Sequence, residues 1–102
     1  MNISRFAPIG VIDSGIGGIS MLKELQKKYI SENYIYLADN QHMPYGNKSS
    51  KFLCRRVLDL VNYLVTSYNV KFVILACNTA SVCCLSYLNK HSPVKVLGLD
   101  IG

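Results

Sequence analysis

Short apolar runs alternate with helical patterns along this chain, and that alternation constrains the fold more than any other feature. The runs cover residues 9–12, 34–38, 70–76 and 94–99. Between them, apolar residues recur every three or four positions, which is the spacing of an amphipathic helix. Strands that alternate with helices form βαβ units with right-handed crossovers. The sequence therefore predicts an α/β fold, with a parallel sheet of about four strands and flanking helices.

Three helices are expected between the runs, and one of them has clear boundary signals. Ser49 or Ser50 can accept a hydrogen bond from the first helical turn as an N-cap, and Asn69 ends the apolar pattern. The run that follows is broken only by Lys71 and is expected to be a strand covered on both faces. The expected helices cover residues 19–29, 50–69 and 78–90.

Composition and charge exclude several classes of protein. No apolar stretch approaches the roughly 20 residues needed to cross a bilayer, and no secretory signal follows the first residues. A cytoplasmic protein is expected. The net charge of +5 is attributed to solvated helix faces and not to a nucleic-acid partner, because no RNA- or DNA-binding pattern accompanies it. The basic residues concerned are Lys27, Lys28, Lys51, Arg55 and Arg56.

The cysteines of the chain are Cys54, Cys77, Cys83 and Cys84. They form neither a CxxC pair nor a spaced framework, and a reducing compartment keeps such residues as thiols. Neither a disulfide nor a zinc site is expected.

Polar motifs follow the first three runs, at the edge of a parallel sheet where ligands bind. They are Asp13-Ser14-Gly15, Pro44-Tyr45-Gly46 and Cys77-Asn78-Thr79. The second motif lies in a long polar connection, and long loops in compact domains often carry function.

Cys77 is expected where a buried strand meets the amino terminus of a helix, whose free N–H groups and dipole stabilise a thiolate. The pattern alone leaves open whether this thiol is reactive or a small core residue. Asn78 and Thr79 can bind a substrate carboxylate or simply cap the helix. Asp13 can hold a substrate ammonium group, relay a proton, or bond only to its own loop.

We assign no catalytic or binding role to the glycine-rich segment or to the two histidines. The glycines of residues 15–18 match neither GxGxxG nor the Walker pattern, so a tight turn is favoured over a nucleotide site. His42 is expected in a solvated loop, and His91 near the carboxyl end of a helix.

Residues 8–18, 39–49 and 76–81 resemble the amino-terminal motifs of the glutamate racemase family, in the family's order and spacing. The resemblance extends from about Pro8 to Val96. It implies interconversion of L- and D-glutamate, which supplies D-glutamate for peptidoglycan, without pyridoxal phosphate, metal or any other cofactor. The resemblance also implies that two cysteines, on opposite faces of the substrate α-carbon, carry out the proton transfer.

The same resemblance assigns roles to individual residues. Cys77 matches the family's first catalytic cysteine, and Asp13 matches the acidic residue that assists it. The positions that hold the substrate are matched by Asp13, Ser14, Pro44, Tyr45, Gly46, Asn78 and Thr79.

The chain departs from the family in length. Family members have two domains, and their second catalytic cysteine, in a Gly-Cys-Thr-His context, lies in the carboxyl-terminal half; that motif is absent from this sequence. Cys83 and Cys84 follow Cys77 on the same helix, about 9 to 10 Å further along its axis, and are expected to be packing residues. Residues 1–102 are therefore expected to form one amino-terminal domain without its carboxyl-terminal counterpart.

Such a half-site is expected to bind glutamate weakly and to be unable to complete racemisation alone, and to self-associate or to pair with the missing half. Two alternatives remain open. One is a fragment of an aspartate racemase or of a broader amino-acid racemase. The other is a non-catalytic small-ligand or interaction module that retains the fold.

Overall fold

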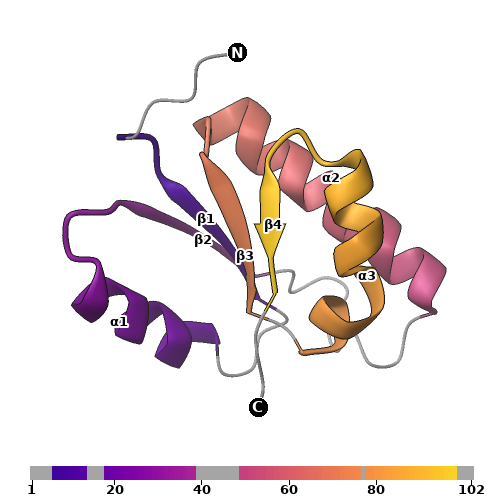
Figure 1. Ribbon diagram of the computed structural model, residues 1–102, viewed down its shortest axis with the longest axis horizontal. Helices are drawn as coiled ribbons and strands as arrows, with labels where there is room; N and C mark the ends of the chain where they lie inside the picture. The colour runs from indigo at the N-terminus through magenta and orange to yellow at the C-terminus, as the bar shows by residue number, and fades with distance from the viewer. Residues whose placement is uncertain (1–5, 14–17, 39–48, 77, 99–102) are drawn as a thin grey trace.

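The computed structural model describes residues 6–13, 18–38, 49–76 and 78–98, in which strands and helices alternate regularly (Figure 1). The α/β fold expected from the sequence is confirmed. The elements are β1 (Ile9–Asp13), α1 (Gly18–Lys28), β2 (Tyr34–Ala38), α2 (Ser50–Tyr68), β3 (Phe72–Ala76), α3 (Asn78–His91) and β4 (Lys95–Leu97).

The four strands form one parallel sheet in the order β2-β1-β3-β4. β1 lies in the interior of this sheet, and all five of its residues are buried. Helices α2 and α3 cover one face of the sheet, and α1 lies on the other (Figure 1). None of the helices in the described part of the chain is long and apolar enough to cross a membrane.

Helix α2 has the boundaries that its capping residues predict. The Ser49 hydroxyl accepts a hydrogen bond from the Phe52 N–H at 3.2 Å, and Asn69 adopts the left-handed conformation with φ 54°. The Asn69 N–H donates to the Val65 carbonyl at 3.0 Å. These contacts satisfy backbone groups that a helix end leaves without intrahelical partners.

The core fills the space between the sheet and the helices α2 and α3. Gly10 of β1 is part of this packing, because a Cβ at that position would lie 3.0 Å from Leu64 Cδ1 and 3.4 Å from both Val70 and Val73. The absence of a side chain at Gly10 thus lets α2 approach the sheet closely. The fully buried large side chains of this core, among the described residues, are Ile12, Leu53, Leu64, Leu75, Leu88, Val57, Val61, Val70, Val73 and Val96. Val11 is also fully buried but lies on the other face of β1.

The opposite face of the sheet is only partly covered. Phe72 and Ile74 of β3 are half-buried, and Leu97 of β4 is 40% exposed. Together with Leu25 and Tyr29 they line part of an apolar cavity of about 420 Å³. The expectation that this strand is covered on both faces is therefore wrong for the α1 side, because α1 packs against β1.

Strand β3 also begins later than its apolar run suggests. The Lys71 N–H donates to the Pro8 carbonyl at 2.8 Å. The Lys71 ammonium group donates to both carboxylate oxygens of Glu32, at 2.6 and 2.8 Å. These contacts hold Lys71 at the amino-terminal end of the sheet, where its charge is paired and only partly exposed.

The outer edge of β4 is capped by a side chain from α3. The Asn89 carbonyl oxygen accepts from the Val96 N–H, and the Asn89 amide donates to the Val96 carbonyl, both at 2.9 Å. Unpaired backbone groups at a sheet edge favour pairing with another chain. Asn89 satisfies those of Val96 within the domain.

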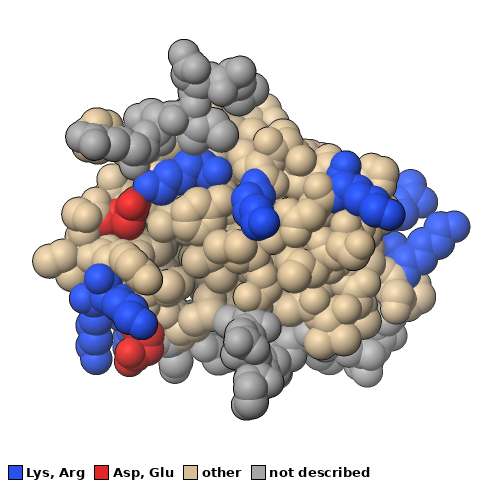
Figure 2. Space-filling model, viewed as in Figure 1, with Lys and Arg blue, Asp and Glu red and all other residues tan. Residues whose placement is uncertain are grey.

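Most of the basic side chains expected on solvated helix faces are exposed to solvent. Lys27, Lys28, Lys51 and Arg55 are exposed, and Arg56 is half-buried. On the face seen in Figure 2 the Lys and Arg side chains form several small groups and not one continuous patch.

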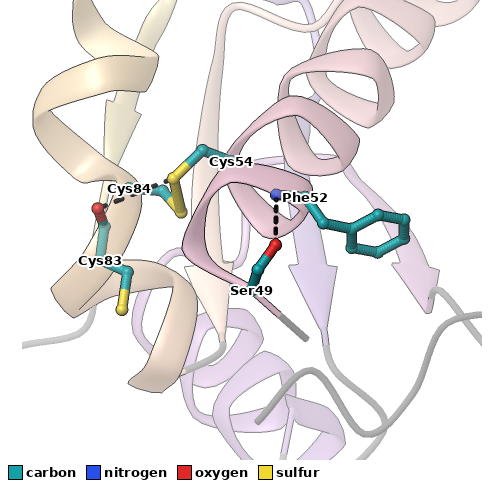
Figure 3. Close-up of a disulfide and its surroundings, with 5 residues drawn as sticks. All are labelled: Ser49, Phe52, Cys54, Cys83 and Cys84. Atoms are coloured by element: carbon teal, nitrogen blue, oxygen red, sulfur yellow. Dashed lines mark hydrogen bonds between the residues drawn. A yellow bond between two sulfur atoms is a disulfide. The ribbon is translucent and has the colours of Figure 1, made fainter. Parts of the chain in front are cut away.

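The expectation that the chain contains no disulfide is wrong. Cys54 of α2 and Cys84 of α3 are joined by a disulfide, with their Cα atoms 5.1 Å apart (Figure 3). The two helices pack side by side on one face of the sheet, so residues separated by 30 positions in sequence meet in the core. Cys84 is fully buried, as expected for a packing residue, but Cys83 is exposed and carries a free thiol.

We expect reduction of this disulfide to lower the free energy of unfolding by about 2–4 kcal/mol, because the cross-link restricts the unfolded chain. Urea denaturation with and without a thiol reductant measures the change. The Cys54→Ala/Cys84→Ala double variant is expected to be insensitive to the reductant, whereas Cys83→Ser retains the sensitivity. An identical urea midpoint with and without reductant for the unsubstituted chain would contradict the assignment.

Gly10→Val is expected to destabilise the fold by about 1–3 kcal/mol through overpacking against Leu64. Thermal and urea denaturation measure the loss. Adding Leu64→Ala provides the control, because it removes the atoms that the new side chain meets. The double variant is therefore expected to lose less stability than the sum of the two single variants. If the stability losses of the two single variants simply add up in the double variant, the side chains at positions 10 and 64 do not clash.

Candidate active site

Three neighbouring strands end side by side at the carboxyl edge of the sheet. Asp13, the last residue of β1, pairs in register with Ala38 of β2 and with Ala76 of β3. In open parallel sheets, ligands bind in the crevice beyond this edge. The motifs that the sequence analysis singled out all begin at or after these positions, and Cys77 directly follows Ala76 in sequence.

Asp13 is the one charged residue in the buried core of the described chain, with 1% of its surface exposed. Its Oδ2 accepts a hydrogen bond from the Tyr36 hydroxyl. Its Oδ1 is also buried and has no hydrogen-bond partner among the described residues. Burial of a carboxylate is costly unless its oxygens are satisfied. The free oxygen marks Asp13 as the strongest functional candidate in the part of the chain that the structure describes.

Tyr36 reaches Asp13 because of the strand register. Tyr36 pairs with Val11, and side chains two residues apart on a strand lie on the same face of the sheet, so Val11, Tyr36 and Asp13 share a face. Burial, followed by the hydrogen bond to Asp13 and its negative charge, raises the pKa of Tyr36 to about 12. The phenol therefore keeps its proton near neutral pH and remains a donor to Asp13.

The other predicted site residues, and the two histidines to which no role was assigned, lie partly inside and partly outside the described ranges. Asn78 and Thr79 open α3 directly after β3, as predicted, but their side chains lie outside what the structure describes. His91 ends α3 and lies against Tyr87, with ring centroids 4.6 Å apart. Predicted residues wholly outside the described ranges are Ser14, Pro44, Tyr45, Gly46 and Cys77, together with His42.

The described ranges contain no group of three His, Cys, Asp or Glu side chains that could hold a metal ion. Cys83 is exposed on α3, and Cys84 is bonded to Cys54. Neither residue contributes to the edge of the sheet where Asp13 lies.

Sequence reasoning did not identify Tyr36. The sequence shows only that side chains alternate between the two faces of β2, so that Tyr34, Tyr36 and Ala38 lie on one face. The register that brings the Tyr36 hydroxyl to Asp13 depends on how β2 pairs with β1, and the sequence of one strand does not contain that information.

We expect Asp13→Asn to lower the pKa of Tyr36 from about 12 towards its ordinary value. The substitution removes the negative charge and the carboxylate acceptor, whereas the remaining burial keeps the pKa above 10. NMR titration of the chain with labelled tyrosine measures the shift. Tyr34 is the internal control, because burial and Glu32 raise its pKa, and it should not respond. An unchanged Tyr36 titration would show that the contact with Asp13 is absent in solution.

The chain matches glutamate racemases in both sequence and structure. It is 45% identical over 89 residues to the glutamate racemase of Buchnera aphidicola subsp. Schizaphis graminum, covering 87% of this chain and 35% of the relative. No protein-family model matches the chain.

Two solved structures show the structural match. The Escherichia coli glutamate racemase in complex with L-glutamate and the activator UDP-MurNAc-ala superposes with a TM-score of 0.83 at 35% identity, over 91% of this chain and 35% of that chain. The Francisella tularensis glutamate racemase in complex with D-glutamate superposes with a TM-score of 0.81 at 33% identity. This match covers 91% of this chain and 35% of that chain.

These matches cover most of this chain but only about a third of each glutamate racemase. The chain spans about 35% of the length of the glutamate racemases it matches, whereas the matches cover about nine-tenths of this chain. The chain is therefore homologous to an amino-terminal portion of the glutamate racemases.

Proposed function

We propose that this chain is the amino-terminal domain of a cytoplasmic glutamate racemase and contributes one half of its active site. The proposed reaction interconverts L- and D-glutamate, without a cofactor, and supplies D-glutamate for peptidoglycan. The observation that carries the proposal is Asp13, a buried carboxylate at the carboxyl edge of the sheet with one oxygen unpaired among the described residues. The choice of substrate is supported by two homologous structures, one in complex with L-glutamate and the other with D-glutamate.

In this proposal Cys77 is the base on one face of the substrate. Its thiolate removes the α-proton, and the electron pair left on the α-carbon is delocalised into the neighbouring carboxylate. A second thiol then donates a proton to the opposite face. One proton leaves the substrate and one returns, so the reaction inverts the α-carbon without net oxidation or reduction.

Asp13 assists the Cys77 side of the site. The last residue of β3, Ala76, lies in register with Asp13, and Cys77 is the next residue in sequence. A carboxylate oxygen without a partner can accept a hydrogen bond from a thiol or from a substrate ammonium group. Substrate contacts are proposed for Ser14, Pro44, Tyr45, Gly46, Asn78 and Thr79.

The second base is proposed to come from the part of a racemase that this chain does not match. Cys83 is exposed on the side of α3, and Cys84 is buried in a disulfide with Cys54. Cys84 therefore has no thiol proton to donate, and the Cys83 thiol is not proposed to reach the opposite face of a substrate held at Asp13. A complete site thus needs a carboxyl-terminal portion, on the same chain or on another.

Exchange of the glutamate α-proton with deuterated water tests the proposal. The chain is incubated with L- or D-glutamate, alone and with a separately expressed carboxyl-terminal portion of the Buchnera aphidicola enzyme. We expect exchange in the mixture and its loss in Cys77→Ala, whereas Cys83→Ala is expected to remain active. Full racemisation by the 102-residue chain alone would disprove the need for a second portion.

Alkylation of the chain by iodoacetamide gives a test that needs no partner. We expect Cys77 to react faster than the exposed thiol of Cys83, because the amino terminus of a helix stabilises a thiolate. Glutamate is expected to slow the reaction at Cys77 but not at Cys83, and peptide mass spectrometry separates the two sites. Equal rates at both thiols, unaffected by glutamate, would count against a substrate site at Cys77.

A further inference from the structure

We propose that Tyr36 is a positioning residue, which fixes the Asp13 carboxylate so that its second oxygen faces the reacting groups. This inference rests on the proposed function, and it adds a residue that the motifs of the sequence do not contain. Tyr36 lies on β2, whereas Asp13 ends β1, so the contact joins two strands at the site.

The geometry leaves the carboxylate with two different oxygens. Oδ2 is bonded to the Tyr36 hydroxyl, whereas Oδ1 is buried without a partner among the described residues. A carboxylate held at one oxygen can no longer rotate freely about its terminal bond. The hydrogen bond therefore gives the unpaired oxygen one direction, as pre-organised catalysis requires.

The phenol suits this role because of its proton and its surroundings. Tyr36 is half-buried in the sheet face that it shares with Asp13. A phenol that keeps its proton donates to the carboxylate without taking part in the proton transfer itself. A hydrogen bond from a phenol to a carboxylate is stronger than one between neutral groups, so the contact can hold the Asp13 side chain in one orientation.

The same strand contains a matched control. Tyr34 precedes Tyr36 by two residues and lies on the same face of β2. Its hydroxyl donates to the carbonyl oxygens of Leu25 and Tyr29, at 3.2 and 3.4 Å. Tyr34→Phe and Tyr36→Phe each remove one hydroxyl group from this strand, but only the second removes a contact with Asp13.

The test is the rate of α-proton exchange of L-glutamate in the mixture with the carboxyl-terminal portion. We expect Tyr36→Phe to lower this rate about tenfold, as removal of a hydrogen bond to a charged group does, while substrate half-saturation changes less than about twofold. Tyr34→Phe is expected to keep the full rate. In an Asp13→Asn background, Tyr36→Phe should lower the remaining rate by less than about twofold, because Tyr36 acts through Asp13.

The outcomes separate this inference from the proposed function. Equal exchange rates for Tyr36→Phe and Tyr34→Phe, in an active mixture, would overturn the role of Tyr36 alone. So would an equal loss from Tyr36→Phe with and without Asp13, because a purely structural residue behaves in that way. If the unsubstituted mixture exchanges no α-proton, the proposed function fails and the positioning role fails with it.

Discussion

The pairing of β1 with β2 on one side and β3 on the other is the constraint on which the rest of the structure depends. Asp13, Ala38 and Ala76 end their strands in register. A shift of one residue would turn Asp13 to the opposite face of the sheet, away from Tyr36 and into the apolar core beneath α2 and α3. The parallel register therefore fixes both the core and the candidate site.

Among the described residues, the carboxylate of Asp13 is the one charged group in an otherwise apolar core. Replacement of Asp13 by a small apolar residue would remove the cost of burying a charge, and one hydrogen bond from Tyr36 offsets that cost only in part. Packing alone therefore does not account for Asp13. The proposed role in catalysis would explain why a carboxylate is buried at the carboxyl edge of the sheet with an Oδ1 that has no partner among the described residues.

Local signals in the sequence predicted most of the fold. The capping candidates Ser49 or Ser50 and Asn69 predicted the ends of α2 to within one residue, because capping is decided by neighbouring backbone groups. Contacts between distant residues were not predictable in this way. The start of β3 depends on the bond between Lys71 and Pro8, and the disulfide joins residues on two different helices.

In the candidate site, too, some residues could be predicted from local sequence and others could not. Asp13 could be singled out from its position after an apolar run, but its unpaired oxygen became visible only with the packing around it. Tyr36 could not be found from sequence, since its contact depends on the pairing of two strands. The order of the motifs indicated the family to which the chain is homologous. The strand register then showed how Tyr36 reaches Asp13.

An NMR titration of the chain with L- and D-glutamate tests the central claim most directly, namely that the substrate binds at the carboxyl edge of the sheet. The account predicts that both enantiomers shift the backbone amide signals of Asp13, Ala38 and Ala76, at the ends of the three paired strands. The signals of Ile9, Tyr34 and Phe72, at the opposite ends of the same strands, should not shift. Shifts confined to those opposite ends, or no shift with either enantiomer, would contradict it.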